Sequence, residues 1–439
     1  MEKKKIKKLI KKPTKKVAKT PSIKSSKVKA KVIKVVKKAV KKIITKKVAK
    51  KSIKKILIKK ITPRKVKKTK KKLKKVLEKS HKGIHIEYEL KLKKSIQNPI
   101  LKPGFYSWES EAVFNPAAIY SGGLVHLFYR ALGEDGISRI GYASSKDGIN
   151  FGNRLTYPVY IAQNIEDAQK HWPFTSPARL VFDPSLYPSG GGWGGCEDPR
   201  TVIIDDTLYM TFNIFNGWNS IRVAVVCIKE ADLLKKKWKW HDFSYLSRPG
   251  DRQKNWVLFP EKINGKFAIF CNLDKGDPDR VFISYVNNLD TRETPSMDEA
   301  LDPQRLPDHE VAWHYRTRSA AMPPIKTKDG WLLLYHAMDK NDSNKYKVGA
   351  LLLDLNDPEK VLHRAQRPIL EPSEWYENDY KPGIVYANGA VVKGGDLYVY
   401  YGGGDKHIAV AQINLDVLLE NLKNNKEIKL KDKIKVIDL

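Results

Sequence analysis

The first 80 residues lack aromatic side chains altogether and contain only two acidic residues, Glu2 and Glu78. Without aromatic rings, this segment has no platform on which nucleic-acid bases could stack, as they do in proteins that bind single strands. It holds 37 lysines and arginines, so it carries the whole formal net charge of +35. The remaining residues contain 46 basic and 46 acidic side chains. The net charge therefore belongs to one segment, and the rest of the chain is neutral.

Long apolar runs and cysteines are also scarce. No stretch approaches the roughly 20 apolar residues of a membrane span, and no uninterrupted apolar run suggests a targeting peptide. The three cysteines, Cys196, Cys227 and Cys271, have no metal-ligand spacing and no obvious pairing. We therefore predict a reduced, cytoplasmic compartment and no metal site. The oligomeric state is left open.

Residues 1–82 form a low-complexity tail of lysine with valine, isoleucine and alanine. Between Ile33 and Ile61 the apolar residues recur roughly at helical spacing, as in a basic amphipathic helix on a membrane or polyanion. β-Branched residues and repulsion between lysines disfavour that helix in isolation. We predict a tail that is disordered or partly helical. Its charge suits salt-sensitive contacts with nucleic acid, another polyanion or an anionic membrane surface.

From residue 83 onward a hairpin pattern recurs five times. Each unit has a short apolar strand, a tight polar turn and a strongly apolar aromatic strand. The five segments are residues 117–130, 201–212, 261–270, 324–336 and 390–401. Repeated antiparallel units of this kind predict an all-β fold, a five-bladed β-propeller over residues 83–439. Helix is expected mainly at Leu415–Leu422, and an irregular two-sheet sandwich is the alternative fold.

A glycine-rich loop brings two acids and a cation to the start of one of these strands. Its sequence is Gly194-Gly195-Cys196-Glu197-Asp198-Pro199-Arg200, and an apolar β-branched run follows at once. Glycine permits close approach of a ligand, and proline fits the first residue of a strand. Adjacent acids beside a cation suit acid–base chemistry on a polar substrate. The alternative is a turn with a surface ion pair.

Polar residues recur at matching places beside all five hairpins. In a propeller the innermost strands and their connecting loops face a central channel, so symmetry would gather such residues around one axis. We expect this of Asn115, Arg130, Asp198, Arg200, Glu261, Lys262, Arg316, Arg318, His336 and Asp405. For His336, a structural hydrogen-bonded role and a ligand contact are both open.

Six short motifs follow one another between about residues 100 and 420. They are Asn115-Pro116-Ala117-Ala118, Phe128-Tyr129-Arg130-Ala131, Glu197-Asp198-Pro199-Arg200, the run from Leu258 to Lys266, Pro323-Pro324-Ile325 through His336, and Tyr400-Tyr401-Gly402-Gly403-Gly404-Asp405. Together they resemble glycoside hydrolase family 130, five-bladed propeller enzymes that include mannoside phosphorylases and some β-mannosidases. The lysine-rich tail lies outside this resemblance.

The resemblance implies an inverting phosphorylase in which Asp198 is the general acid. In such enzymes one aspartate protonates the glycosidic oxygen through a hydroxyl of the mannosyl residue. Inorganic phosphate, the co-substrate, attacks the anomeric carbon and releases α-mannose 1-phosphate. Since phosphate brings its own nucleophilic oxygen, the protein needs no base, and no further cofactor is expected.

The resemblance also implies binding roles. Asn115, Arg130 and Asp405 would bind the mannosyl residue of a manno-oligosaccharide, and Glu197 would brace the site. Basic groups give charge-assisted hydrogen bonds to phosphate. That pocket is assigned to Arg200, Lys262, Arg316, Arg318 and His336, with either Arg316 or Arg318 pointing inward.

Three alternatives remain at this stage. An inverting β-mannoside hydrolase would need a second carboxylate to activate water, with Glu261 as a conceivable base. A non-catalytic sugar-binding propeller would not need an acid together with a basic set. A nucleic-acid-binding protein would be expected to carry basic patches beyond the tail, yet residues 81–439 have no net excess of positive charge.

Overall fold

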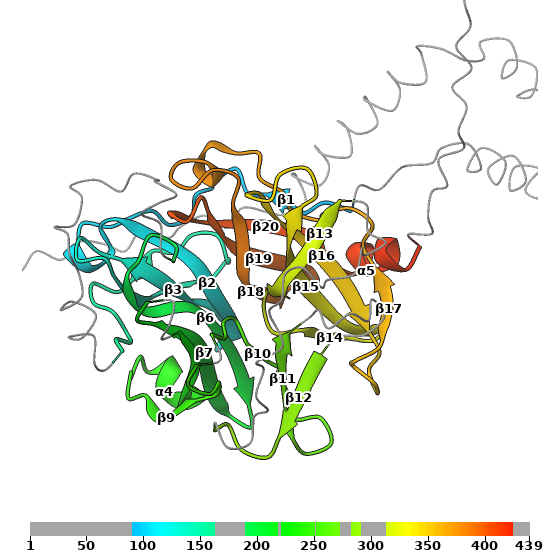
Figure 1. Cartoon of the computed structure of the whole chain (residues 1–439), viewed down its shortest axis with the longest axis horizontal. Helices are drawn as coiled ribbons and strands as arrows, with labels where there is room; N and C mark the ends of the chain where they lie inside the picture. Colours follow the sequence, from blue (N-terminus) through cyan, green and yellow to red (C-terminus); the bar gives the residue numbers. More distant parts are fainter. Residues whose placement is uncertain are drawn as a thin grey trace, which may run out of the picture. The chain divides into compact units, whose positions relative to one another are not determined.

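The structure is a computed structural model, drawn in Figure 1, and it describes residues 90–162, 189–217, 221–250, 252–272, 282–290 and 313–424. The chain divides into two units, Met1–Glu87 and Tyr88–Leu439, and the described residues all belong to the second. The predicted tail over residues 1–82 lies outside them. Among the helices of the described residues, none has both the length and the apolar character needed to cross a membrane.

The described residues fold mainly as antiparallel β-sheet, which confirms the all-β prediction (Figure 1). The largest sheet contains the first two hairpin units. Its strands, in hydrogen-bonded order, are β2 (Ala112–Ser121), β3 (Leu124–Leu132), β4 (Ile137–Ser145), β6 (Gly194–Ile204), β7 (Thr207–Phe215), β8 (Arg222–Lys229) and β9 (His241–Tyr245), with β5 (Asn153–Arg154) beside β4.

Three smaller sheets complete the fold. One joins β10 (Val257–Leu258), β11 (Phe267–Asn272) and β12 (Phe282–Val286). The next has the order β13 (His314–Ala320), β15 (Gly330–Asp339), β16 (Tyr346–Leu353) and β17 (Val361–Arg364), with β14 (Ile325–Thr327) also on β15. The last has the order β1 (Lys93–Lys94), β20 (His407–Asn414), β19 (Asp396–Gly403) and β18 (Val385–Lys393).

Helix is scarce among the described residues. The α-helices are α4 (Glu230–Leu234) and α5 (Leu415–Asn424), and the short 3-10 turns are η1 (Ser107–Glu109) and η4 (Trp375–Glu377). Helix α5 confirms the helix predicted after the last hairpin. Its buried leucines join the hydrophobic core formed by the second and third of the smaller sheets, which includes Leu352 of β16 and Leu397 of β19.

The first strands of separate units approach one another closely. Strand β2 packs against both β6 and β18, and β18 also contacts β6, as Figure 1 shows near the centre of the fold. Glycine makes the contact between β18 and β2 possible, because a Cβ built on Gly389 of β18 would lie 2.3 Å from the backbone nitrogen of Ala118 on β2. A short parallel bridge between β4 and β6 joins the first two units at Ile137 and Gly194.

Two predicted strands are placed differently by the structure. The third unit begins with β10, so Glu261–Ile263 lies farther along, where Ile263 and Lys266 close the hairpin turn. The fourth unit begins with β13, and the predicted strand near Ile325 is the additional strand β14. Both segments match a hairpin pattern, but the buried strand that starts each unit lies upstream.

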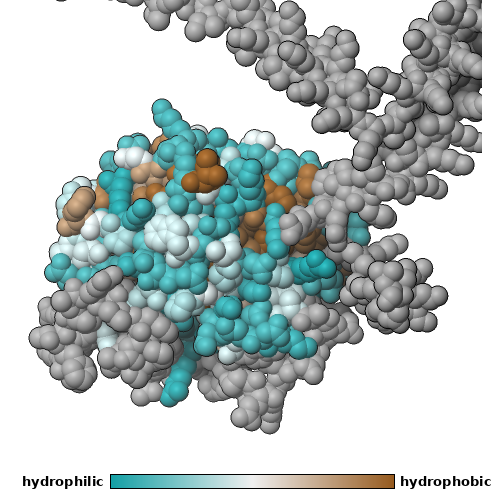
Figure 2. Space-filling model, turned by 90° about the horizontal axis from the view of Figure 1, so that it is seen from above, coloured by the Kyte–Doolittle hydropathy of each residue, from teal (hydrophilic) through white to brown (hydrophobic). Residues whose placement is uncertain are grey.

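The face drawn in Figure 2 is mostly hydrophilic, with apolar residues in separate patches. Large apolar side chains that are exposed include Ile96, Phe105 and Trp375. Scattered apolar residues of this kind are normal on soluble surfaces. The apolar mass lies inside, in clusters that include Trp256, Trp331 and Tyr335.

Candidate active site

Asp198 lies within β6, at a bulge where the backbone is irregular. The register between β6 and β7 shifts between Glu197 and Arg200, and Asp198 has φ 51°. A bulge of this kind re-aims a side chain, and a left-handed backbone at a residue other than glycine is enriched at functional sites. Asn115, Asn255 and Asp405 share this conformation, with φ values of 48°, 63° and 53°. Asn115 and Asp198 therefore lie at bulges within β2 and β6, whereas Asn255 precedes β10 and Asp405 lies in the turn between β19 and β20.

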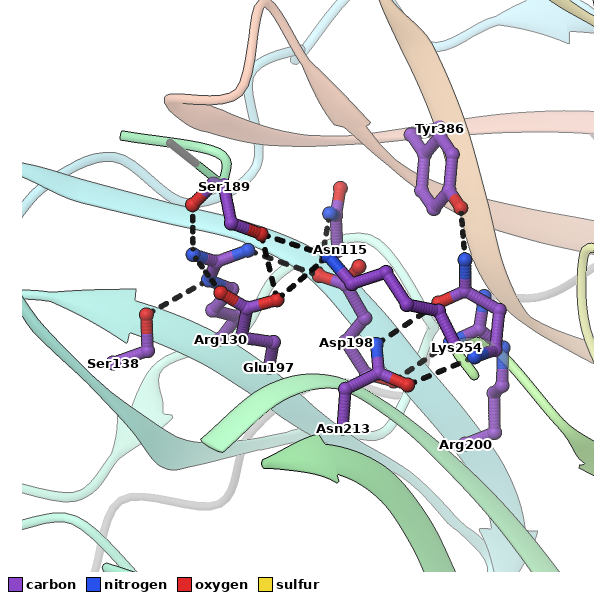
Figure 3. Close-up of polar contacts among 11 residues, drawn as sticks. Asn115, Arg130, Ser138, Ser189, Glu197, Asp198, Arg200, Asn213, Lys254 and Tyr386 are labelled. Carbon is purple, nitrogen blue, oxygen red and sulfur yellow. Dashed lines mark hydrogen bonds and ion pairs between the residues drawn. The ribbon is translucent and has the colours of Figure 1, made fainter. Parts of the chain in front are cut away.

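The Asp198 carboxylate contacts the first hairpin unit through one oxygen. Asn115 Nδ2 donates to Asp198 Oδ1 at 2.8 Å, and Arg130 Nη1 approaches the same oxygen at 3.4 Å (Figure 3). Among the described residues no hydrogen bond reaches Oδ2 of this carboxylate. The side chain is 8% exposed. One oxygen is thus fixed by the protein, and the other is left for a ligand.

A second buried carboxylate, Glu197, is fully engaged in holding cations. Its Oε1 lies 3.1 Å from Arg130 Nη2, and its Oε2 lies 3.0 Å from Lys254 Nζ and 2.8 Å from Ser189 Oγ. Ser138 Oγ also accepts from Arg130 Nε at 2.9 Å. Figure 3 shows this network beside Asp198. Glu197 therefore fixes the two cations that face Asp198, in keeping with the bracing role that the resemblance implied.

The charges around Asp198 determine its protonation. Burial alone would raise the pKa of Asp198, but the positive charges of Arg130, Lys254 and Arg200, with the Asn115 hydrogen bond, bring the pKa below its ordinary value. Without ligand, the group is a carboxylate at neutral pH. An anion bound among these cations would offset them and raise the pKa, which is what a proton donor requires.

Arg200 lies behind Asp198 and connects three segments. Its Nη1 donates to the Asp198 carbonyl at 2.7 Å and to Asn255 Oδ1 at 3.2 Å, and its Nε donates to the Ala321 carbonyl at 3.3 Å. The residue is 2% exposed. Its Nη2 is buried and has no hydrogen-bond partner among the described residues. A buried guanidinium nitrogen without a hydrogen-bond partner can donate to an acceptor on a bound ligand.

His336 on β15 presents a second buried donor. Its ring stacks on Tyr386 with centroids 3.8 Å apart, and Nδ1 lies 3.2 Å from Ser319 Oγ. Burial, with a smaller contribution from the charge of Arg200, lowers the pKa of His336 to about 3. The ring is therefore neutral. When Nδ1 accepts from Ser319, Nε2 carries the proton. This buried atom makes no well-aligned hydrogen bond in the described part of the chain, although the backbone carbonyl of Ala387 lies close enough to the ring to oppose the lowering of its pKa.

Asn255 and Tyr386 link these two donors, and neither was predicted from the sequence. Asn255 Nδ2 donates to Tyr386 Oη at 2.9 Å, while Asn255 Oδ1 accepts from Arg200. Asn213 fixes Asn255 through two hydrogen bonds, at 2.8 Å and 3.0 Å. The signal available was the position of Asn255, directly before the apolar strand that starts the third unit.

The remaining predicted residues are placed as follows. Arg318 on β13 is exposed. Burial lowers the pKa of His336 and raises the pKa of Tyr386, and the charge of Arg318 makes a smaller downward contribution to both pKa values, so Arg318 lies near these two side chains. Asp405 is buried and its charge helps burial to raise the pKa of Tyr380, on which Arg130 also acts. The backbone of Arg316 lies in β13, and its side chain is outside the described residues.

The structure contradicts the prediction that Lys262 joins this site. Lys262 Nζ pairs with Asp205 Oδ2 at 3.2 Å at the surface. Asp205 lies in the turn that ends β6, seven residues beyond Asp198, which corresponds to roughly 20 Å along a strand. The cation that the third unit contributes is Lys254, which precedes β10. Glu261, the conceivable base of a hydrolase, pairs instead with Lys326 at 2.6 Å.

Comparisons with known proteins identify the family of the chain. A model of the glycoside hydrolase 130 family, described as β-1,4-mannooligosaccharide phosphorylase, matches residues 91–424. A 1,2-β-oligomannan phosphorylase of Thermoanaerobacter sp. (strain X514) is 37% identical over 337 residues, covering 74% of this chain and 98% of that protein. A β-1,2-mannobiose phosphorylase of the same organism is 37% identical and covers 74% and 97%.

Solved structures show the same fold. The β-1,2-mannobiose phosphorylase of Listeria innocua, in complex with β-1,2-mannobiose, superimposes with a TM-score of 0.55 at 23% identity, covering 76% of this chain and 99% of that one. A glycosyl hydrolase from Bacteroides ovatus gives a TM-score of 0.55 at 24% identity, covering 74% and 94%. The family match and the 37% identity over nearly whole relatives establish that the chain belongs to glycoside hydrolase family 130.

Proposed function

We propose that this chain is an inverting phosphorylase that cleaves β-mannosidic linkages of manno-oligosaccharides with inorganic phosphate and releases α-mannose 1-phosphate. The observation that carries the proposal is a pair of buried donors next to the Asp198 carboxyl, Arg200 Nη2 and His336 Nε2, for which the described residues supply no well-aligned hydrogen-bond acceptor. Phosphate oxygens accept charge-assisted hydrogen bonds from such groups. The names of the related enzymes support the same activity.

In this mechanism the roles are divided between two faces of the sugar. A phosphate oxygen, held by Arg200, His336 and Arg318, forms a bond to the anomeric carbon as the bond from that carbon to the glycosidic oxygen breaks. The glycosidic oxygen takes its proton from Asp198, through a sugar hydroxyl. The bound phosphate offsets the cations that lower the pKa of Asp198, so phosphate binding would also favour the protonated acid.

The geometry favours phosphorolysis over hydrolysis. An inverting hydrolase needs a second carboxylate to activate water. Glu197 is bonded to two cations and a hydroxyl, and Glu261 lies in a surface ion pair. By the family resemblance, Asp405 would bind hydroxyl groups of the mannosyl residue and would not act as a base. In a phosphorylase, no carboxylate has to act as base.

The proposed substrate has β-1,2 linkages. Relatives named for β-1,2-linked substrates are 37%, 37% and 32% identical to this chain, whereas a β-1,4-mannooligosaccharide phosphorylase of Ruminococcus albus is 28% identical. A relative named 4-O-β-D-mannosyl-D-glucose phosphorylase is 23% identical. Identity alone supports this choice of linkage.

The purified chain should therefore convert β-1,2-mannobiose only when phosphate is present. We expect β-1,2-mannobiose to be used at least about tenfold better than β-1,4-mannobiose, since a site built for one linkage leaves polar groups unpaired with the other. Sugar release from both disaccharides, measured with and without phosphate, tests this. Equal use of both would refute the linkage, and full activity without phosphate would refute phosphorolysis.

Closure of the sheets into five blades and a cytoplasmic location belong to the same proposal. The approach of β2, β6 and β18 and the likeness to family structures support a propeller. The cysteines of the described part of the chain, Cys196, Cys227 and Cys271, are free thiols, which fits a reducing compartment.

We propose that the tail localises the enzyme on a polyanion and has no part in catalysis. Removing residues 1–80 should leave kcat and KM within about twofold, because the residues that form the site all lie beyond it. Binding of the full chain to DNA, RNA or anionic vesicles should fall steeply between roughly 50 and 200 mM salt and vanish on truncation. A folded but inactive truncated enzyme would refute the first point, and salt-insensitive binding the second.

A further inference from the structure

A cluster of three potential metal ligands lies outside the candidate active site. Cys227 is on β8, and His241 and Asp242 begin β9. Cys227 Sγ lies 3.4 Å from His241 Nδ1 and 3.4 Å from Asp242 Oδ2, and the latter two atoms are 2.7 Å apart. Within the described residues, this is the group of three such side chains whose ligand atoms converge.

The backbone brings all three side chains to one face of the sheet. Cys227 and His241 are direct partners in the β8–β9 pairing, so their side chains point the same way. The next residue of a regular strand would point to the opposite face. Asp242 instead has φ 52°, and the β8–β9 register shifts between Val225 and Cys227. This irregularity turns the Asp242 carboxylate back towards the other two groups.

We propose that Cys227, His241 and Asp242 bind a zinc ion. A thiolate, an imidazole nitrogen and a carboxylate are the ligands zinc takes in proteins, at about 2.3, 2.0 and 2.1 Å. A tetrahedral ion at those distances separates its ligand atoms by about 3.3–3.6 Å. The two sulfur contacts already have this spacing, and the His241–Asp242 contact needs to widen by about half an ångström. Both of these side chains are exposed and can move.

The surroundings suit a divalent cation with one open position. Thiolate and carboxylate together supply two negative charges, and the thiol proton leaves to solvent when the metal binds. Lys229 is the neighbouring cation, and its ammonium donates to Thr207 Oγ1 at 3.0 Å. Tyr209, opposite Cys227 on β7, flanks the cluster on its inner side. Water would take the fourth position, because His241 and Asp242 open to solvent.

The role assigned to this ion is structural. Strand β9 is the last strand of the eight-stranded sheet and pairs only with β8. A metal bridging the two strands would pin that edge. The cluster lies on β8 and β9, two and three strands from β6, which carries Asp198, so zinc should change stability and leave phosphorolysis unchanged.

The test is zinc titration of the full-length, tag-free chain after chelator treatment, followed by calorimetry. One zinc should bind per chain, and cobalt(II) should give the thiolate-to-metal charge-transfer absorption that reports cysteine ligation. His241→Ala and Asp242→Asn should each weaken binding by about a hundredfold or more, since even outer-sphere changes cost 10–100-fold. Zinc should raise the Tm of the native chain and not that of these variants.

Matched controls separate this site from general metal binding. His363→Ala removes a partly buried histidine from β17, outside the cluster, and should leave zinc affinity unchanged. His241→Ala affects an exposed side chain, so folding should survive, as circular dichroism would verify. Absence of saturable zinc binding, or equal affinity in the native chain and His241→Ala, would show that the three groups form a hydrogen-bonded cluster only.

Discussion

Asp198→Asn should lower kcat for phosphorolysis by about 10²–10⁴-fold, the usual contribution of a general acid. The amide keeps the shape of the side chain and can still accept from Asn115 Nδ2, but it has no proton to deliver to the leaving group. Asparagine tolerates the left-handed backbone that Asp198 adopts at φ 51°, so the fold should be retained. Steady-state kinetics with β-1,2-mannobiose, together with circular dichroism, measures both effects.

Asp205→Asn is the matched control for that variant. Asp205 has a similar left-handed backbone, φ 49°, but lies in the exposed turn after β6. The control should change kcat by less than about twofold, as expected for a surface substitution. A loss of less than tenfold in Asp198→Asn would mean that another residue supplies the proton.

His336→Phe should raise KM for phosphate by about 10–100-fold, because a hydrogen bond to a charged group contributes about 1.5–3 kcal/mol. Phenylalanine preserves the stacking on Tyr386 and removes the Nε2 donor. Arg200→Lys should have an effect in the same direction, since an ammonium cannot replace the guanidinium fork. KM for mannobiose should change much less. Kinetics with each substrate varied in turn separates the two constants.

Lys262→Ala is the control for the phosphate pocket. The sequence assigned Lys262 to this pocket, whereas the structure places it in a surface pair with Asp205. Surface ion pairs contribute little to stability, so the KM of Lys262→Ala for phosphate should stay within about twofold of the native value. A large rise in the KM for phosphate in Lys262→Ala, with none in His336→Phe, would show that Lys262 and not His336 binds phosphate.

Much of the fold could be predicted because hairpin patterns are local. The turns at Ser121-Gly122-Gly123 and Asp205-Asp206 lie between strands as expected. The third unit was misplaced because Glu261–Ile263 also matches a strand before an Asn-Gly turn, while the inner strand, β10, is only two residues long. Length and polarity along the chain do not indicate which of the neighbouring apolar segments starts a sheet.

The site was predictable where a motif carries several groups together. The segment from Gly194 to Arg200, predicted as a loop and found within β6, carries the proposed acid, its brace and one proposed phosphate donor. Lys254, Asn255 and Tyr386 were missed because their relevance depends on contacts between units. Asn255 meets Arg200 across 55 residues and Tyr386 across 131. Nothing in the sequence distinguishes Lys254 from the other lysines, and only its ion pair with Glu197 in the structure places it at the site.

The ionisation of the acid also depends on these distant contacts. A sequence motif with an acid beside an arginine does not reveal whether burial or charge dominates its pKa. Here three cations from separate segments outweigh burial. In the proposed mechanism, the acid would stay ionised until an anion enters the pocket, so proton donation would depend on phosphate binding.

In the proposed reaction phosphate, and not water, attacks the anomeric carbon. The most direct measurement is to run the reaction with β-1,2-mannobiose and ordinary phosphate in water enriched in heavy oxygen, and to analyse the products by mass spectrometry and phosphorus NMR. Phosphorolysis should give α-mannose 1-phosphate without heavy oxygen, in an amount equal to that of the released mannose. Mannose carrying heavy oxygen at the anomeric carbon from direct attack, with no mannose 1-phosphate formed, would contradict it.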